Sequence, residues 1–566
     1  MSARGHRLGQ EEQFCRHPQS NRLAHGSFIP HWAAIEHMAA FPVEDRSSCG
    51  TGGLAGLSFY VTMHFSTLHP VRLSKTRFLA GVQCLKRLYL EVHAPELAAA
   101  VDAERQIMLD MGKEVGEKAR ERFPGGQLIK ESHRQTEAAL HRTADLMRDV
   151  SVPAIYEGAF LWQHIVVRAD ILERVDGDRW RLIEVKAATK VKNGYLDDLA
   201  IQELVIRGAG YVLEQCCLMH VNTEYVYQGG EVDLSQLFTI VDVTAAVRQR
   251  RSQVIRQVRL MKTMLQRPEP PAIEPDDHCH TPYTCPFWDH CTSGKPARWI
   301  HRLPGSRQSI RQLAARGIET IDEIPVTVPL SLAQRRVKDN VEWISPDLLT
   351  HLQALEHPIH HLDFETMMPA VPIYANTRPY RPIPVQWSNH IEMEDGSIRH
   401  DEYLAEQASD PRRELTEALL RSLGDRGSIC VYSEYERHVL LSLGELFPDL
   451  RGAIQRVVQR LWDLLSVIQQ HYYHPAFNGS FSMKSVLPAL IPDLSYSRLV
   501  IGHGALASAT YKKMVFEETD LVERLRMATA LREYCGRDTW GMVELRRILL
   551  AKAMHAYSTQ ARGSDS

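Results

Sequence analysis

Two strand-like runs on either side of a tight turn constrain the fold of this chain most. Residues 160–175 and 179–188 are rich in aliphatic, aromatic and β-branched side chains, and the sequence Asp-Gly-Asp at positions 176–178 separates them. This pattern predicts a β-hairpin. A helix is expected to begin near Tyr195 and to run through Gln202, so the hairpin belongs to a mixed α/β domain.

The predicted hairpin gathers charged side chains on one face. Glu184 and Lys186 project to the same side because side chains alternate along a strand. With a three-residue loop, Val175 pairs with Arg179. Counting back from that pair places Asp170 opposite Glu184. Two carboxylates can hold Mg²⁺ at such a site, and Lys186 can orient the attacking water. The alternative is an exposed cross-strand charge pair.

The composition excludes several classes of protein. Of 566 residues, 44% are hydrophobic and 24% are charged, which excludes a disordered chain, a collagen and a disulfide scaffold. A formal net charge of −3 excludes a globally basic surface, so any nucleic acid would be held by local patches. No apolar run reaches the roughly 18 residues of a membrane helix, and no signal-peptide pattern is seen. We therefore expect a cytoplasmic protein without a membrane partner.

Periodicity and composition divide the chain into parts. The expected parts are a poorly ordered extension at 1–70, a first α/β domain at 71–295, a basic helical linker at 296–345, a second α/β domain at 346–555 and a disordered tail at 556–566.

Two basic stretches could contact phosphates. The predicted helix at 247–267 contains no acidic residue. The Pro304-Gly305 turn resembles the turn of a helix-hairpin-helix element, in which backbone N–H groups face a phosphate. Arg307 and Arg311 would assist there. The alternative is a solvated linker, and neither stretch predicts sequence-specific reading of bases.

Four cysteines form a second group of candidate ligands. Cys84 precedes the hairpin, and Cys279, Cys285 and Cys291 follow it with five residues between successive members. Zinc modules usually space paired ligands by two to four residues, so this spacing disfavours zinc. Four thiolates suit a cubane iron–sulfur cluster. The alternatives are free thiols, or a zinc site that adds one of three histidines: His278, His280 or His290.

A third group of candidate residues lies in the second half of the chain. Asp363 and Glu365 are two apart on a predicted strand, so both face one side. Tyr534 and Asp538 are four apart on a predicted helix and share a side. Glu436 follows another predicted strand. Converging carboxylates could hold two divalent ions about 4 Å apart, with Tyr534 positioning the water. Taken separately, each pair also occurs by chance on a solvated surface.

The first half resembles a known nuclease core. Asp170 with Glu184-Val185-Lys186 resembles the PD-(D/E)XK nucleases, particularly the RecB-like branch, and Gln202 matches the glutamine that this branch carries on the next helix. One early and three late cysteines are similar to the iron–sulfur members, including the CRISPR-associated exonucleases. In these proteins a 4Fe-4S cluster joins the ends of the nuclease domain.

The chain departs from that branch at two positions. Gly116 stands near the position of the usual early histidine, and Ile206 replaces the tyrosine expected four residues after the glutamine. Either Glu114 or Glu117 could supply the early carboxylate.

The second half resembles the DnaQ-like DEDD exonucleases on an RNase H-like fold, in the form that carries a tyrosine. Glu436 replaces the usual second-motif aspartate, and Asp463 is the fallback ligand. The segment 471–496, together with the LDFET and YCGRD motifs, resembles a bacterial domain-of-unknown-function family that joins a RecB-like to a DnaQ-like domain. That resemblance covers about residues 73–550. His474 and Lys484 could contact phosphate, or their loop could simply pack over the site.

These resemblances imply a nuclease that uses Mg²⁺ or Mn²⁺. We expect hydrolysis of phosphodiester bonds at DNA ends or single strands, in repair, processing or defence, with 3′ to 5′ degradation by the second domain. The alternatives are a catalytically degenerate nucleic-acid-binding scaffold and an RNA-processing nuclease.

Overall fold

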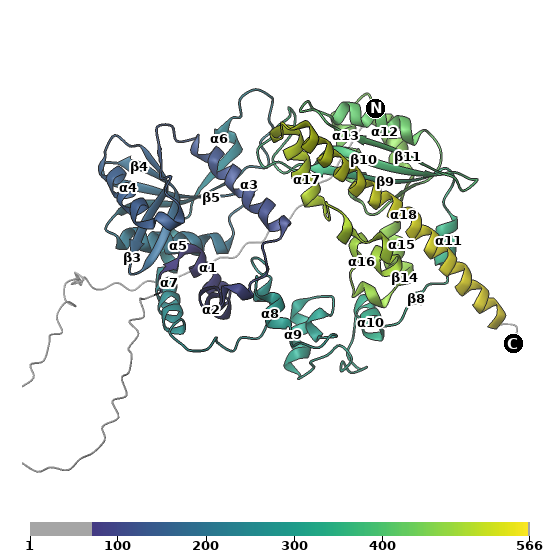
Figure 1. Cartoon of the computed structure of the whole chain (residues 1–566), viewed down its shortest axis with the longest axis horizontal. Coiled ribbons are helices and arrows are strands. Elements are labelled where there is room, and N and C mark those ends of the chain that lie inside the picture. The colour runs from purple at the N-terminus through teal and green to yellow at the C-terminus, as the bar shows by residue number, and fades with distance from the viewer. Residues whose placement is uncertain (1–70, 564–566) are drawn as a thin grey trace, which may run out of the picture. The chain divides into compact units, whose positions relative to one another are not determined.

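The computed structural model of the chain describes residues 71–563 (Figure 1). The extension expected at 1–70 lies outside the described residues. The tail expected at 556–566 is helical through residue 563, because helix α18 (Leu521–Gly563) continues to that point. No proline or glycine interrupts residues 542–562, so nothing in the local sequence ends the helix earlier.

The first part of the described chain is built on a seven-stranded sheet with the order β2-β3-β4-β5-β6-β7, and β1 pairs with β4. Its strands are β1 (Leu73–Ser74), β2 (Gln127–Leu128), β3 (Ala154–Trp162), β4 (Ile165–Asp176), β5 (Arg179–Lys186), β6 (Val212–Val221) and β7 (Phe238–Asp242). Strands β3, β4 and β5 form an antiparallel meander, whereas β5 and β6 are parallel. Helix α5 (Asn193–Gly208) makes the crossover between the parallel strands.

Helices cover both faces of this sheet. They are α1 (Lys75–Gln83), α2 (Leu85–His93), α3 (Ala103–Arg120), α4 (Thr136–Arg148), α6 (Leu234–Leu237), α7 (Thr244–Met264) and α8 (Trp288–Thr292), besides α5. Leu172 and Leu182 of the sheet belong to the core shared with α5 and α7. Ile171 and Ile183 belong to the core shared with α3. From Ile171 onward in β4, and along β5, even-numbered positions therefore face α5 and odd-numbered positions face α3.

The β4–β5 hairpin has the expected register but a different turn. Ile171 pairs with Ile183, as the sequence predicts. Asp176, not Val175, pairs with Arg179, and a bulge takes up the extra residue. The turn glycine has a φ of 50°, which suits a two-residue turn.

The segment expected as a linker contains α9 (Arg307–Ala315), α10 (Leu332–Asp339) and β8 (Trp343–Ile344). The Pro304 carbonyl accepts a hydrogen bond from Gln334 Nε2 at 2.9 Å. Arg307 and Arg311, expected to face phosphate, form ion pairs with Asp277. These side chains are therefore engaged within the protein.

The second sheet has five strands in the order β11-β10-β9-β12-β13. Its strands are β9 (Ile359–Met367), β10 (Ile383–Glu392), β11 (Ile398–Leu404), β12 (Ile429–Val431) and β13 (Leu461–Asp463). Strands β9, β10 and β11 are antiparallel, and β12 is parallel to both β9 and β13. Strand β14 (Tyr472–Tyr473) pairs with β8. The described chain is thus mixed α/β, with parallel and antiparallel pairing.

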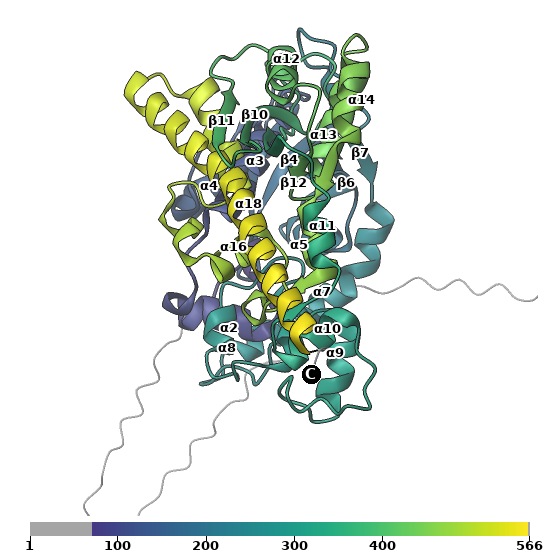
Figure 2. The same ribbon diagram turned by 90° about the vertical axis from the view of Figure 1, so that its right-hand side faces the viewer.

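Two helical layers flank the second sheet. The helices of this part are α11 (Leu348–Gln353), α12 (Arg412–Leu423), α13 (Tyr435–Leu446), α14 (Arg451–Gln459), α15 (Leu464–His471), α16 (Met483–Leu490), α17 (Gly504–Lys512) and α18. Leu362 and Phe364 of β9 pack with α12, α13 and α14. Ile359 and Met367 belong to the core that includes α18, the long yellow helix of Figure 2. Odd-numbered positions of β9 therefore face α18.

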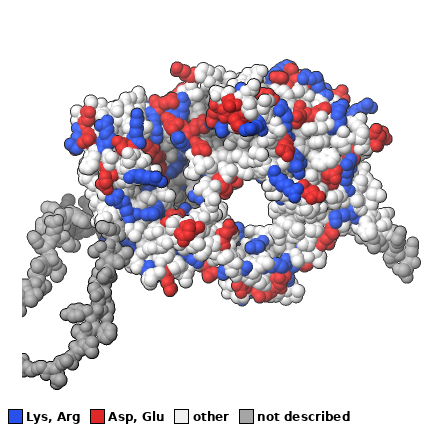
Figure 3. Space-filling model, viewed as in Figure 1, with Lys and Arg blue, Asp and Glu red and all other residues white. Residues whose placement is uncertain are grey.

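Charged side chains of both signs are intermixed on the face shown in Figure 3. Within residues 71–563, no helix combines the length and hydrophobicity needed to cross a membrane.

Candidate functional site

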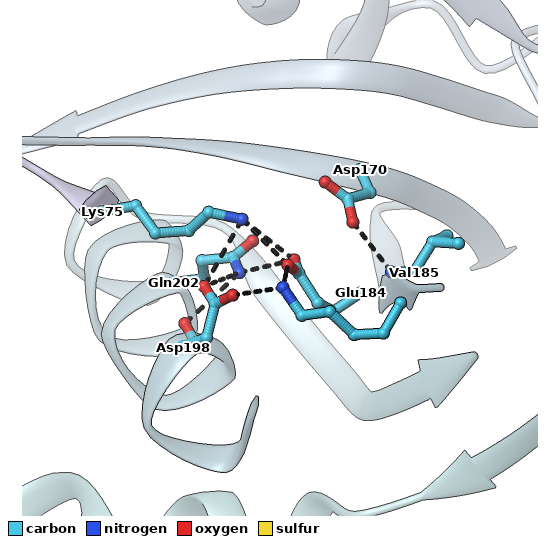
Figure 4. A network of polar contacts seen from close by, with 7 residues as sticks. Lys75, Asp170, Glu184, Val185, Asp198 and Gln202 are labelled. Atoms are coloured by element: carbon cyan, nitrogen blue, oxygen red, sulfur yellow. Dashed lines mark hydrogen bonds and ion pairs between the residues drawn. The ribbon is translucent and has the colours of Figure 1, made fainter. Parts of the chain in front are cut away.

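The first candidate site lies where β5 meets α5 (Figure 4). Glu184 is 1% exposed, and both of its carboxylate oxygens are hydrogen-bonded. Lys186 Nζ donates to Oε1 at 2.6 Å, and Gln202 Nε2 donates to Oε2 at 2.8 Å. Lys75 Nζ donates to both oxygens, at 3.0 and 3.2 Å. This burial excludes the exposed charge pair that was the alternative for Glu184.

Asp198 and Lys75 belong to this network and were missed from the sequence. Asp198 accepts from Lys186 at 2.7 Å and from Gln202 at 3.0 Å, and it lies 3.4 Å from Lys75. Asp198 precedes Gln202 by four residues on one helix, so helical spacing could have indicated it. Lys75 has no such local signal.

Asp170 stands at the other side of Glu184 and has a different partner. Its Oδ2 accepts a hydrogen bond from the backbone N–H of Val185 at 2.8 Å. Burial and the neighbouring Glu184 raise the pKa of Asp170 to about 7. Burial also opposes ionisation of Glu184, but Lys186 and Lys75 outweigh it and hold the pKa of Glu184 well below its usual range.

Neither expected early carboxylate joins this network. Glu114 forms an ion pair with Lys512 at 2.5 Å, and Glu117 forms one with Lys113 at 4.0 Å. Ile206, at the position of the usual tyrosine, is buried in the core.

The second candidate site lies between β9 and α18. Asp363 and Glu365 share the odd-numbered face of β9, and Asp538 faces them from α18. Carboxylate oxygens of these three residues all lie within 4.8 Å of one another. In the part of the chain that the structure describes, this is the single group of three or more potential ligands that meets this distance.

Glu436 contributes further negative charge to the second site. It lies in the first turn of α13 and is 3% exposed, and its Oε2 has no hydrogen-bond partner among the described residues. It acts electrostatically on both Asp363 and Glu365. Asp463, the fallback ligand, accepts from the backbone N–H of Leu465 as the N-cap of α15. Asp463 therefore already has a structural role.

Two tyrosines hold Asp538. The hydroxyl groups of Tyr496 and Tyr534 both donate hydrogen bonds to its carboxylate. Tyr534 precedes Asp538 by one helical turn, as expected, but Tyr496 was missed. It lies in a short 3₁₀ turn (Tyr496–Arg498) that no spacing pattern relates to Asp538. Lys484 is close enough to act electrostatically on Glu365 and Asp538.

The second site concentrates charge without an ion-paired cation. In residues 71–563, no lysine or arginine forms an ion pair with Asp363, Glu365, Glu436 or Asp538. Burial, followed by repulsion from Asp538 and other nearby acids, raises the pKa values of Asp363 and Glu365 well above their usual range. Burial likewise raises the pKa of Asp538 to about 6 and that of Glu436 to about 8.

The four spaced cysteines line one small cavity, together with His278 and Trp288. Cys84 directly follows α1, and Gln83 Nε2 donates to the carbonyls of His278 and Tyr283 at 2.6 and 2.8 Å. The other three are Cys279, Cys285 and Cys291. No three of these sulfur atoms, all in described residues, lie within 4.8 Å of one another. The His280 ring packs against the Trp288 ring at an interplanar angle of 56° and does not line the cavity.

The fold and these sites define a mixed α/β protein with two buried acidic networks and a four-cysteine cavity. Residues 360–482 match the family model described as Domain of unknown function (DUF2779), and this segment contains Asp363, Glu365 and Glu436. No curated protein matches the chain. Among solved structures, the chain is similar to the crystal structure of SSO0001, with 14% identity over 40% of this chain and 87% of that chain and a TM-score of 0.19.

Proposed function

We propose that the chain is a metal-dependent nuclease that hydrolyses phosphodiester bonds, with the second site as its catalytic centre. One observation carries this proposal: three carboxylates within 4.8 Å of one another that no lysine or arginine of residues 71–563 neutralises by an ion pair. Ionised carboxylates packed in this way repel one another unless cations bind between them. Carboxylate oxygens are the donors that Mg²⁺ and Mn²⁺ prefer.

The residues present fit a pair of divalent ions. Asp363, Glu365 and Asp538 would hold them, and the unpartnered oxygen of Glu436 supplies a further donor. Bound ions would lower the pKa of water and stabilise charge that develops on the phosphate. Tyr534 donates to Asp538 and fixes the direction of that carboxylate. Lys484, which makes no hydrogen bond or ion pair with the described residues, is available to contact phosphate.

The arrangement of elements supports finer fold assignments. We assign the region 346–555 to the RNase H-like fold of the DnaQ type, because a three-stranded antiparallel meander continues into two parallel strands. We assign residues 71–295 to the PD-(D/E)XK fold, because Glu184 and Lys186 lie on the last meander strand and Gln202 on the crossover helix. The substrate would be DNA ends or single strands, degraded 3′ to 5′ by the second site.

Cleavage of labelled single strands in Mn²⁺ tests the proposal. We expect the wild-type protein to shorten DNA in preference to matched RNA. Asp363→Asn should lower the rate by at least about 10²-fold, since it removes a charge that the ions require. Asp395→Asn, in the exposed turn between β10 and β11, is the matched control and should cleave normally. Retained binding without cleavage by the wild type would instead indicate a scaffold, and preferred cleavage of RNA an RNA-processing nuclease.

We also propose that the cysteine cavity holds an iron–sulfur cluster. Four thiols line it, and no three of their sulfur atoms lie within 4.8 Å of one another among the described residues, whereas a zinc tetrahedron with bonds of about 2.3 Å has edges of about 3.8 Å. Hydrogen bonds from Gln83 already join the N-terminal helix to the cysteine segment, and a cluster would strengthen this connection.

Metal content tests the cluster assignment. Protein purified without oxygen should contain iron and sulfide and absorb at about 400 nm. Cys279→Ala should lose the iron. Cys217→Ala, which removes a buried thiol of β6 away from the cavity, should retain it. Stoichiometric zinc without iron would overturn the assignment.

A further inference from the structure

Lys75 is held at the first site by the fold of its own segment. Strand β1 pairs in parallel with β4, so Ser74 lies beside Val166 of the central meander. Ser74 then caps α1 by accepting from the backbone N–H of Arg77 at 3.2 Å. Lys75 is the first residue of α1, and Cys84 follows its last residue. The position of Lys75 is therefore fixed by the sheet on one side and by a regular helix on the other.

The ammonium group of Lys75 occupies the place that a cation would take. Its Nζ lies 3.0 and 3.2 Å from the two oxygens of Glu184 and 3.4 Å from Asp198, and its side chain is 21% exposed. Figure 4 shows this ammonium directed at the carboxylate of Glu184. A divalent ion bound by Glu184 would need the same oxygens.

The charges of the first site support the same conclusion. Asp170, Glu184 and Asp198 face two ammonium groups, those of Lys75 and Lys186. Most of the negative charge is thus neutralised by the chain itself. A divalent ion would bring further positive charge next to two fixed cations, which opposes its binding. No lysine or arginine within residues 71–563 pairs in this way with the acids of the second site.

We propose that Lys75 is a positioning residue that serves as the resident cation of the first site, so that Asp170 and Glu184 take no divalent ion while Lys75 is in place. Lys75 also orients Glu184 and Asp198 toward Lys186. This inference rests on the proposed function in one respect, because it treats the network around Glu184 as a nuclease site. The binding of Mn²⁺ itself can be measured without substrate.

Binding of Mn²⁺ in a background that lacks the second site tests this proposal. In Asp363→Asn protein, we expect titration calorimetry to detect no Mn²⁺ bound through Glu184 and the thermal midpoint to be unchanged by Mn²⁺. Adding Lys75→Met should create one Mn²⁺ site and a midpoint that rises with Mn²⁺, because the ion replaces the missing ammonium. A further Glu184→Gln change should abolish that site.

Two controls separate a specific role from general damage. Lys75→Arg keeps a cation at this position and should remain insensitive to Mn²⁺. Lys192 is an exposed lysine whose ammonium group, like that of Lys186, lies near the Tyr195 ring. The Lys192→Met protein should also remain insensitive to Mn²⁺. A gain of metal binding cannot arise from misfolding alone.

Three results would overturn the inference. The first is that Asp363→Asn protein with Lys75 intact binds Mn²⁺ and that adding Glu184→Gln abolishes this binding. This result does not require the Lys75→Met protein to fold. The second is folded Lys75→Met protein that gains no Mn²⁺ site. The third is Lys192→Met protein that gains one. If the wild-type protein cleaves no nucleic acid, the proposed function is overturned, but these Mn²⁺ binding results are unaffected.

Discussion

The two acidic sites of this protein compensate buried charge in opposite ways. At the first site, Lys75 and Lys186 contact the carboxylates directly. At the second site, Asp363, Glu365 and Asp538 converge with no ion-paired lysine or arginine in the described chain. Burying unpaired charge is costly, so the charge of the first site is largely balanced within the chain, whereas the second site leaves negative charge that the proposed ions would neutralise. The comparison contrasts carboxylates that ammonium groups pair with carboxylates that no described cation pairs.

The largest expected effect is the loss of a lysine from the first site. Lys186→Met leaves Glu184 and Asp198 without bonds of 2.6 and 2.7 Å and exposes three acids to one remaining ammonium. Breaking a buried pair of this kind should lower the free energy of unfolding by about 3 kcal/mol. Urea denaturation at pH 7 measures it, and Lys192→Met should change it by less than about 0.5 kcal/mol. If Lys186→Met and Lys192→Met both change the free energy of unfolding by less than about 0.5 kcal/mol, the network contributes little stability.

The sheets beneath the two sites should also differ in their response to acid. Burial, with Arg460 nearby, lowers the pKa of His360 to about 4, and burial, with His400 nearby, lowers that of His390 to about 4. Strands β4 and β5 contain no histidine. A histidine whose folded pKa is depressed adds stability above its unfolded pKa of about 6.5, and this stability is lost as the pH falls toward 4.

The change in stability with pH can be assigned to one sheet or the other. From pH 7.5 to pH 6, His360 and His390 together should lower the stability of the second sheet by about 1.5 kcal/mol, whereas Asp170, whose folded pKa is about 7, should raise that of the β4–β5 hairpin by about 1 kcal/mol as it takes up a proton. Hydrogen exchange of peptides from each sheet, corrected for intrinsic rates, measures the difference. His390→Asn should remove about half of the contribution of His360 and His390, and the exposed His133→Asn should leave that contribution unchanged. Equal losses in both sheets would contradict the assignment.

Local sequence patterns predicted which residues share an element, and the family resemblance led us to expect that Asp363, Glu365 and Asp538 would meet. Residues that no motif marks were missed. Strand alternation placed Glu184 and Lys186 on one face, and helical spacing related Tyr534 to Asp538. Lys75 and Tyr496 reach their partners through the β1–β4 pairing and through a 3₁₀ turn.

Burial was the other quantity that the sequence could not supply. The alternative of an exposed pair at Glu184 was reasonable from spacing alone, because charged pairs on sheets are common. The structure instead places α1 and α5 over this carboxylate. Likewise, the β4–β5 register follows from side-chain alternation, but the two-residue turn depends on backbone geometry at its glycine.

The smallest expected effect is a gain in stability, whereas Lys186→Met should cause a loss. It therefore tests the contrast between the two sites most directly. Glu365→Gln removes one charge from a cluster whose members repel one another, so the metal-free variant should be more stable than the wild type by about 1 kcal/mol. Urea denaturation in a chelator measures this gain. In saturating Mn²⁺ the order should reverse, because the wild type gains binding energy that the variant lacks. If Glu365→Gln destabilises the metal-free protein as Lys186→Met does, then the second site is not an uncompensated cluster, and the contrast between the two sites fails.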